Sequence, residues 1–197
     1  NCTIINNYAS NEAGGLFNKS GSNTQVDSCS FIANTVSANG GGAIYNETNT
    51  NVVINNSTFM QNSTAAGRYG AAILNSTSSN TTIFKCHFVN NNAGFGGAIH
   101  NNSCSPVIDS CSFENNLATI NGGAISIYGS TSMPQISGST FIKNKATGNG
   151  GAIYGNASKP QITANNFSGN KAYNGASIFS ESSSAAILIK QCNFLSD

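Results

Sequence analysis

The sequence predicts an all-β fold, a parallel β-solenoid of about seven coils with 25–29 residues in each coil. Three observations predict it, and each recurs along the whole chain. They are a run of small residues ending in an aliphatic residue, a Phe with an Asn three positions later, and an aliphatic residue five positions before that Phe. A fixed period of this length is a signature of repeat architectures. We therefore expect residues 1–197 to form one repeat domain, as a segment of a longer solenoid or as a self-stacking subunit.

The first repeated feature is the run of Gly, Ala or Ser before an aliphatic residue. Its aliphatic members are Leu16, Ile44, Ile73, Ile99, Ile125, Ile153 and Ile178, spaced by 28, 29, 26, 26, 28 and 25 residues. The units are rich in Gly, Asn, Ser and Thr and poor in helix formers, which argues against helical repeats of similar length. Short runs with apolar residues two apart, broken by Gly and Asn, indicate β-strands instead. The glycines are expected to provide the turns with positive φ.

Stacked parallel strands lie about 4.8 Å apart, so like residues should lie above like residues. The phenylalanines are therefore predicted to form one buried stack: Phe31, Phe59, Phe88, Phe113, Phe141, Phe167 and Phe194. The aliphatic residues from Val26 to Ile189 should form a second buried ladder. The asparagines are predicted to form a corner ladder in which each amide bonds the next coil. They are Asn34, Asn62, Asn91, Asn116, Asn144 and Asn170.

Charge and hydropathy limit the partners. Only 8% of residues are charged and the net charge is +1, so the chain lacks the clustered Lys and Arg that nucleic-acid binding requires. The apolar runs are too short to span a membrane, and any secretion signal is expected outside this segment. The apolar fraction of 39%, with regularly placed Phe, argues against disorder.

Five of the six cysteines share one repeat position, two before the Phe or its equivalent. They are Cys2, Cys29, Cys86, Cys111 and Cys192. Alternation along the strand points this position inward with the Phe, which favours a ladder of small buried side chains. Disulfides between adjacent coils, Cys2–Cys29 and Cys86–Cys111, are the alternative, because Cα atoms about 4.8 Å apart are within disulfide range. No Cys-x-x-Cys with matching His spacing occurs, so neither a metal nor a cofactor is expected.

Eleven Asn-x-Ser/Thr sequons are possible N-glycosylation sites. They are Asn1, Asn18, Asn46, Asn55, Asn56, Asn62, Asn75, Asn80, Asn101, Asn156 and Asn166. Four of them, at 18, 46, 75 and 101, lie two positions after the aliphatic anchor. For these four the alternative is a second ladder of buried, unmodified amides.

The sequence contains few candidate catalytic residues. A glycosidase needs two carboxylates within about 5–10 Å, hence on one face of the same or adjacent coils. Asp27 and Asp109 share a repeat position but are expected three coils apart, and Glu47 and Glu181 five coils apart. The sequence therefore predicts no catalytic residue, and both histidines, His87 and His100, are expected at the surface.

The position directly after the aliphatic anchor is partly aromatic, and it could face either way. It reads Phe17, Tyr45, Leu74, His100, Ser126, Tyr154 and Phe179. Facing outward, it would be a stripe suited to protein or glycan contact; facing inward, it would be core.

The repeated motifs resemble those of the chlamydial polymorphic membrane proteins, a family of autotransporter-type surface proteins. The matching stretches include Gly41 to Tyr45, Gly150 to Tyr154 and Phe141 to Asn144, and the resemblance spans the chain. This sequence is richer in Asn than that family. The resemblance implies a right-handed parallel β-helix, located outside the cell and implicated in adhesion.

We therefore expect a non-enzymatic, secreted or cell-surface scaffold, either an adhesin stalk or a subunit of an extracellular filament. The alternative is a carbohydrate-active β-helix enzyme, a polysaccharide lyase or glycoside hydrolase, with its site outside this segment. The chain itself is the first expected partner, because uncapped end coils expose strand edges that template further pairing. A host-cell or surface protein or glycan is the second.

Overall fold

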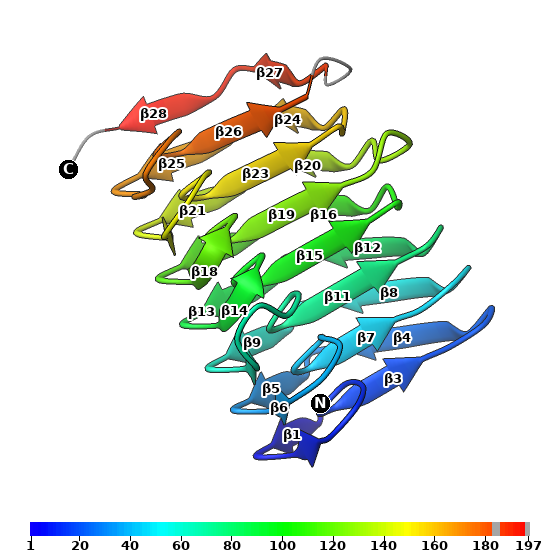
Figure 1. Ribbon diagram of the computed structural model, residues 1–197. Helices are drawn as coiled ribbons and strands as arrows, with labels where there is room; N and C mark the ends of the chain where they lie inside the picture. Colours follow the sequence, from blue (N-terminus) through cyan, green and yellow to red (C-terminus); the bar gives the residue numbers. More distant parts are fainter. Residues whose placement is uncertain (183–185, 196–197) are drawn as a thin grey trace.

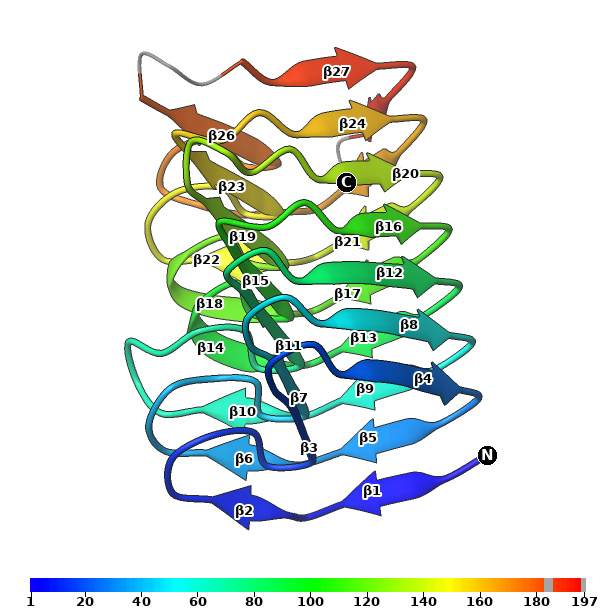
Figure 2. The same ribbon diagram turned by 90° about the vertical axis from the view of Figure 1, so that its right-hand side faces the viewer.

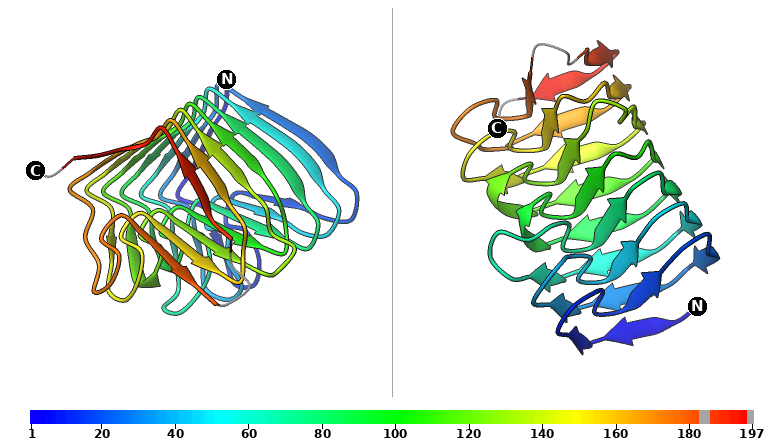
Figure 3. Two further views of the ribbon diagram at one scale, coloured as in Figure 1. Left: turned by 90° about the horizontal axis from the view of Figure 1, so that it is seen from above. Right: turned by 45° about the vertical axis from the view of Figure 1, so that its right-hand side comes forward.

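The computed structural model describes residues 1–182 and 186–195, which form a parallel β-helix whose regular elements are all strands. The coils stack along one axis, with the first strand and the last strand at opposite ends (Figure 1). Four parallel sheets run along that axis, and strands of adjacent coils are neighbours within each sheet. Turned by 90°, the stack shows the second and fourth sheets on opposite sides (Figure 2). Seen along the axis, the coils superpose with a gradual rotation (Figure 3).

We number the sheets by the order in which the chain enters them. The first sheet contains β1 (Thr3–Ile5), β5 (Ser30–Ile32), β9 (Thr58–Met60), β13 (His87–Val89), β17 (Ser112–Glu114), β21 (Thr140–Ile142), β25 (Asn166–Ser168) and β28 (Asn193–Leu195). The second sheet contains β2 (Tyr8–Ala9), β6 (Thr35–Val36), β10 (Ser63–Thr64), β14 (Asn92–Phe95), β18 (Leu117–Asn121) and β22 (Lys145–Ala146).

The third sheet follows the Gly-Gly-Ala-Ile motif. It contains β3 (Leu16–Asn18), β7 (Ile44–Asn46), β11 (Ile73–Ser76), β15 (Ile99–Asn102), β19 (Ile125–Tyr128), β23 (Ile153–Asn156) and β26 (Ile178–Glu181). The fourth sheet contains β4 (Asn23–Asp27), β8 (Asn51–Asn55), β12 (Asn80–Phe84), β16 (Val107–Asp109), β20 (Gln135–Ser137), β24 (Gln161–Thr163) and β27 (Leu188–Lys190).

The phenylalanines of the first sheet form a continuous stack along the axis. Phe88 pairs in register with Phe59 and Phe113, and neighbouring rings of the stack lie 4.8–5.0 Å apart with nearly parallel planes. The stack is buried from Phe31 to Phe167. The prediction of burial is wrong for Phe194, which is 53% exposed because no further coil of the described residues covers it. The aliphatic ladder likewise ends in Ile189, which is 42% exposed.

The asparagines after the Phe positions lie buried at the corner between the first and second sheets. The Nδ2 atom of Asn91 donates to Oδ1 of Asn116 at 2.9 Å and to the carbonyl of Phe59 at 3.0 Å. The backbone N–H of Asn91 donates to the same Oδ1 at 3.1 Å. This pattern repeats from coil to coil, and Asn7 extends it by one rung. The corner therefore satisfies its buried polar groups internally.

Steric constraints explain the two glycines of the Gly-Gly-Ala-Ile motif. Gly122 has a φ of +71°, a conformation that side chains with a Cβ rarely adopt. A Cβ on Gly123 would lie 2.0 Å from the carbonyl oxygen of Gly151 in the next coil. Glycine does not provide every turn, however. Lys143 and Ala164 sit at corners with φ of 54° and 55°.

Candidate functional site

The outer face of the third sheet carries a groove lined by aromatic and amide side chains. Alternation along each strand points Ile44, Ile73 and Ile99 into the core and the next residue away from it. The partly aromatic position therefore faces away from the Phe stack. Its central members, Tyr45 to Tyr154, are nevertheless buried, because the segments leading into the third sheet fold over them.

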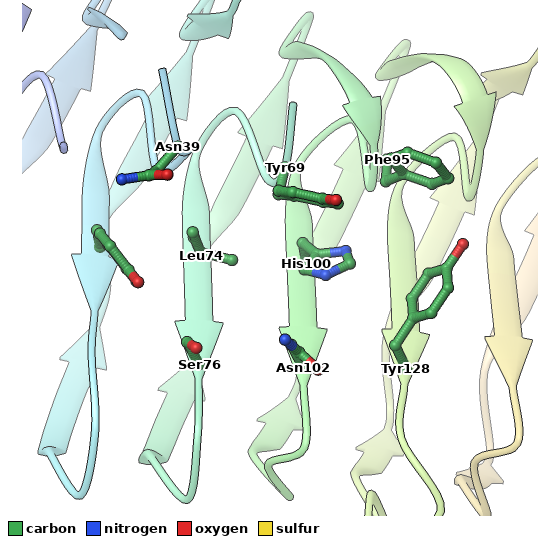
Figure 4. Close-up of a pocket in the computed structure, with 9 residues that line it drawn as sticks. Asn39, Tyr69, Leu74, Ser76, Phe95, His100, Asn102 and Tyr128 are labelled. Atoms are coloured by element: carbon green, nitrogen blue, oxygen red, sulfur yellow. The ribbon is translucent and has the colours of Figure 1, made fainter. Parts of the chain in front are cut away.

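The groove lies across β7, β11, β15 and β19 and has a volume of about 290 Å³. Three residues come from the covering segments: Asn39, Tyr69 and Phe95, which is the last residue of β14. The others come from the sheet: Tyr45, Leu74, Ser76, His100, Asn102 and Tyr128. The covering residues form one row above the sheet residues, and Ser76 and Asn102 lie at the opposite side (Figure 4).

Ring contacts hold much of the groove wall together. The ring centroid of Tyr69 lies 5.5 Å from that of Phe95 and 4.7 Å from that of His100. Tyr128 meets Phe95 edge to face at 5.8 Å and lies 5.3 Å from His100. Tyr69 is 38% exposed, so the wall presents an aromatic ring to solvent. Three residues of the aromatic stripe, Tyr45, Leu74 and His100, are thus neither a free surface nor part of the main core, but form the floor of a covered groove.

His100 is buried within this wall, and the expectation that it lies at the surface is wrong. Its Nδ1 atom lies 2.6 Å from the hydroxyl oxygen of Ser126 in the next coil. Burial lowers the pKa of His100 from 6.5 to about 3, so the imidazole is neutral at physiological pH. His87, in contrast, is exposed and lies 2.7 Å from the hydroxyl of Ser112.

Beyond the groove, the same outer face contains a tyrosine–carboxylate contact. The hydroxyl of Tyr154 donates to Oε2 of Glu181 at 2.5 Å. Burial and this hydrogen bond raise the pKa of Tyr154. Burial also raises the pKa of Tyr128, so both phenols remain protonated at neutral pH.

None of the six cysteines forms a disulfide bond in the structure. Cys86 and Cys111 are buried and adjacent, with the N–H of Cys86 3.5 Å from Sγ of Cys111, whereas Cys2 is exposed. The shared inward position is thus a ladder of small side chains in the middle of the stack, and the bridges Cys2–Cys29 and Cys86–Cys111 stay predictions. Cys104 lies outside this position, and burial raises its pKa to about 12.

The sequons divide by burial. Asn18, Asn46, Asn75 and Asn101 form a second amide ladder, with Nδ2–Oδ1 distances of 2.8–2.9 Å between neighbours. These four and Asn62 are buried, which leaves no room for a glycan on the folded chain. The other six remain accessible to different degrees: Asn1, Asn55, Asn56, Asn80, Asn156 and Asn166.

The structure separates Asp27 from Asp109. Strand register runs from Asp27 through Asn55 and Phe84 to Asp109, which places the two aspartates three strands, about 14 Å, apart. Asp109 has Ser137 as its partner on the other side.

No group of three or more His, Cys, Asp or Glu suited to a metal ion occurs among residues 1–182 and 186–195. Over the same residues, no helix has the length and apolarity needed to cross a membrane.

Sequence reasoning identified Tyr45, Leu74 and His100 of the groove. It missed the strand residues Ser76, Asn102 and Tyr128 and the residues that cover the groove. Asn39, Tyr69 and Phe95 lie outside the three repeated anchors, and coil-to-coil bridges align Tyr69 with Gly40 and Phe95. The signal that could have found them is the Tyr or Phe that precedes the Gly-rich motif in two successive coils.

No curated protein and no solved structure matches this chain. The sequence profile described as "right handed beta helix region" matches residues 33–194, which is most of the chain. The chain belongs to the right-handed β-helix family.

Proposed function

We propose that this chain is a non-enzymatic scaffold of an extracellular or cell-surface assembly, acting as an adhesin stalk or as a subunit of an extracellular filament. One observation carries the proposal: the most regularly repeated side chains all make coil-to-coil contacts. The Phe positions stack on one another, and the corner asparagines bond one another and the backbone. A repeat whose shared residues serve stacking favours a rigid rod over a catalytic centre.

The last coil supports assembly with further coils. Phe194 is 53% exposed, although it occupies the repeat position that is buried from Phe31 to Phe167. Ile189 is 42% exposed at a position that is buried in the coil before it. We propose that additional solenoid, from the same polypeptide or from a second copy, covers these side chains in the native particle.

A coil deletion tests the scaffold role. Removing residues 88–112 joins His87 to Phe113 and preserves the register of every sheet. A rod should remain folded and become shorter by about 4.8 Å in small-angle scattering. Loss of cooperative folding in this variant would contradict a modular rod.

Labelling of intact cells tests the location. An antibody against the folded chain should bind cells of the source organism before they are permeabilised. Labelling that requires permeabilisation would refute the surface role. Incubation with acidic and neutral polysaccharides should release no reducing ends, and release that depends on the native fold would favour the lyase or hydrolase alternative.

A further inference from the structure

On the outer face of the third sheet, the position after the aliphatic anchor carries a ring in every coil except at Leu74 and Ser126. Phe17 and Tyr45 contact each other at 5.2 Å, and Tyr154 and Phe179 at 6.0 Å. Ser126 has no ring, but Tyr128 of the same strand takes over the contact with the neighbouring coils. Its ring lies 5.3 Å from the His100 ring and 5.5 Å from the Tyr154 ring.

At Leu74 no aromatic side chain of the same strand takes over this contact. Leu74 lies in register between Tyr45 and His100, whose strands are two spacings, about 9.6 Å, apart. The groove lies at this interruption. The position therefore has an aliphatic floor with an aromatic residue on each side.

The covering segment adds an aromatic face that is open to a ligand. Tyr69 is 38% exposed, and its ring packs on His100 and Phe95, which restrict its movement. A pre-positioned ring loses little conformational freedom when a ligand stacks on it.

The polar groups of the groove are amides and hydroxyls. Asn39 and Asn102 are exposed at its rim, and Ser76 is partly exposed beside them. His100 is neutral because its burial disfavours the charged form. None of the nine lining residues therefore carries a charge at neutral pH.

We propose that this groove binds one neutral pyranose unit of a glycan, with Tyr69 against the apolar face of the sugar ring and Asn39 and Asn102 facing its hydroxyls. The volume of about 290 Å³ is at the small end of ligand pockets and suits one or two rings. A purely aromatic guest would leave the rim amides without partners, which carries a desolvation cost. An acidic sugar would find no cation among the lining residues. The proposal rests on the adhesin role for its biological meaning.

The test is a titration of the nitrogen-labelled chain with three methyl glycosides, those of glucose, galactose and N-acetylglucosamine, followed by NMR. At least one glycoside should shift the backbone amides of Tyr69, His100 and Asn102. Tyr69→Ala should weaken that binding roughly 2- to 12-fold, the effect of one lost ring contact. Tyr69→Phe keeps the ring and should bind nearly as well as the parent chain.

Leu74→Phe supplies the missing ring and should abolish binding. Tyr173→Ala is the matched control, because Tyr173 is 84% exposed and does not line the groove. Binding is compared only among variants whose thermal stability equals that of the parent chain. Should Leu74→Phe fail to fold, Asn102→Ala serves as a second variant that is expected to lose binding.

Three results would overturn the proposal: no shift with any glycoside, shifts from p-cresol alone, or equal affinity for glucuronic acid and the neutral glycosides. Glycoside binding by a chain that is not exposed on cells would refute the adhesin role and leave the groove assignment intact.

Discussion

Asn144 and Asn170 are joined twice across adjacent coils. The Nδ2 atom of Asn144 donates to Oδ1 of Asn170 at 3.0 Å, and the backbone N–H of Asn144 donates to the same oxygen at 3.0 Å. Nδ2 also donates to the carbonyl of Phe113 at 3.0 Å. One side chain thus links its own coil to a coil on each side, which explains why this Asn recurs whatever residues flank it.

Asn116→Ala should destabilise the chain by at least about 2 kcal/mol, because it leaves the buried backbone N–H of Asn91 without its acceptor and removes the bond to the carbonyl of Phe88. Asn51→Ala is the control, since Asn51 belongs to an exposed amide ladder with Asn23 and Asn80. Its cost should be about 0.5 kcal/mol or less. Urea unfolding of both variants measures the difference, and equal stabilities would show that the buried ladder adds nothing.

Phe113→Ala should cost about 3–5 kcal/mol, as expected for a fully buried aromatic ring removed from a packed core. Phe194→Ala should cost clearly less, because Phe194 is 53% exposed and has Phe167 on one side. Thermal and urea unfolding compare the two. A Phe113→Ala chain as stable as the Phe194→Ala chain would contradict the stack as the main source of stability.

His100 should make the chain less stable in acid. The unfolded chain takes up a proton on this residue below pH 6.5, whereas the folded chain does so only near pH 3. The stability is therefore complete above pH 6.5 and falls as the pH drops from 6.5 towards 3. The slope from this group is at most about 1.4 kcal/mol per pH unit. His100→Gln should reduce the acid loss seen in urea unfolding, and His87→Gln, as the control, should retain it.

Glycan occupancy should follow burial if the chain is expressed in a glycosylating host. Peptide mass spectrometry after deglycosylation should find no modification at the buried sequons Asn18, Asn46, Asn62, Asn75 and Asn101. Occupancy should be confined to accessible sequons such as Asn56 and Asn80, which are exposed. A glycan on Asn75 in the folded chain would be incompatible with its bonds to Asn46 and Asn101.

The fold could be predicted in detail because a solenoid converts sequence period directly into spatial neighbours. The spacing that aligns Phe88 with Phe113 also fixes which asparagines and which cysteines meet. The groove could be predicted only in part. Tyr45 and His100 belong to the repeat, but Tyr69 lies in a connecting segment whose path depends on long-range contacts. The burial of His100 was missed for the same reason, since the residues that cover it lie outside the repeated anchors.

The amide ladders give the rod an electrical direction. From Asn7 to Asn144, every amide-to-amide bond of the corner ladder runs from Nδ2 of one coil to Oδ1 of the coil nearer the C-terminus, and the ladder from Asn18 to Asn101 does the same. Dipoles aligned head to tail add along an axis, as peptide dipoles do in an α-helix, and hydrogen bonds in such chains polarise one another. The end of the rod nearer the C-terminus should therefore carry partial positive potential and the other end partial negative potential. Although the net charge is only +1, two such rods would attract each other head to tail and repel each other head to head.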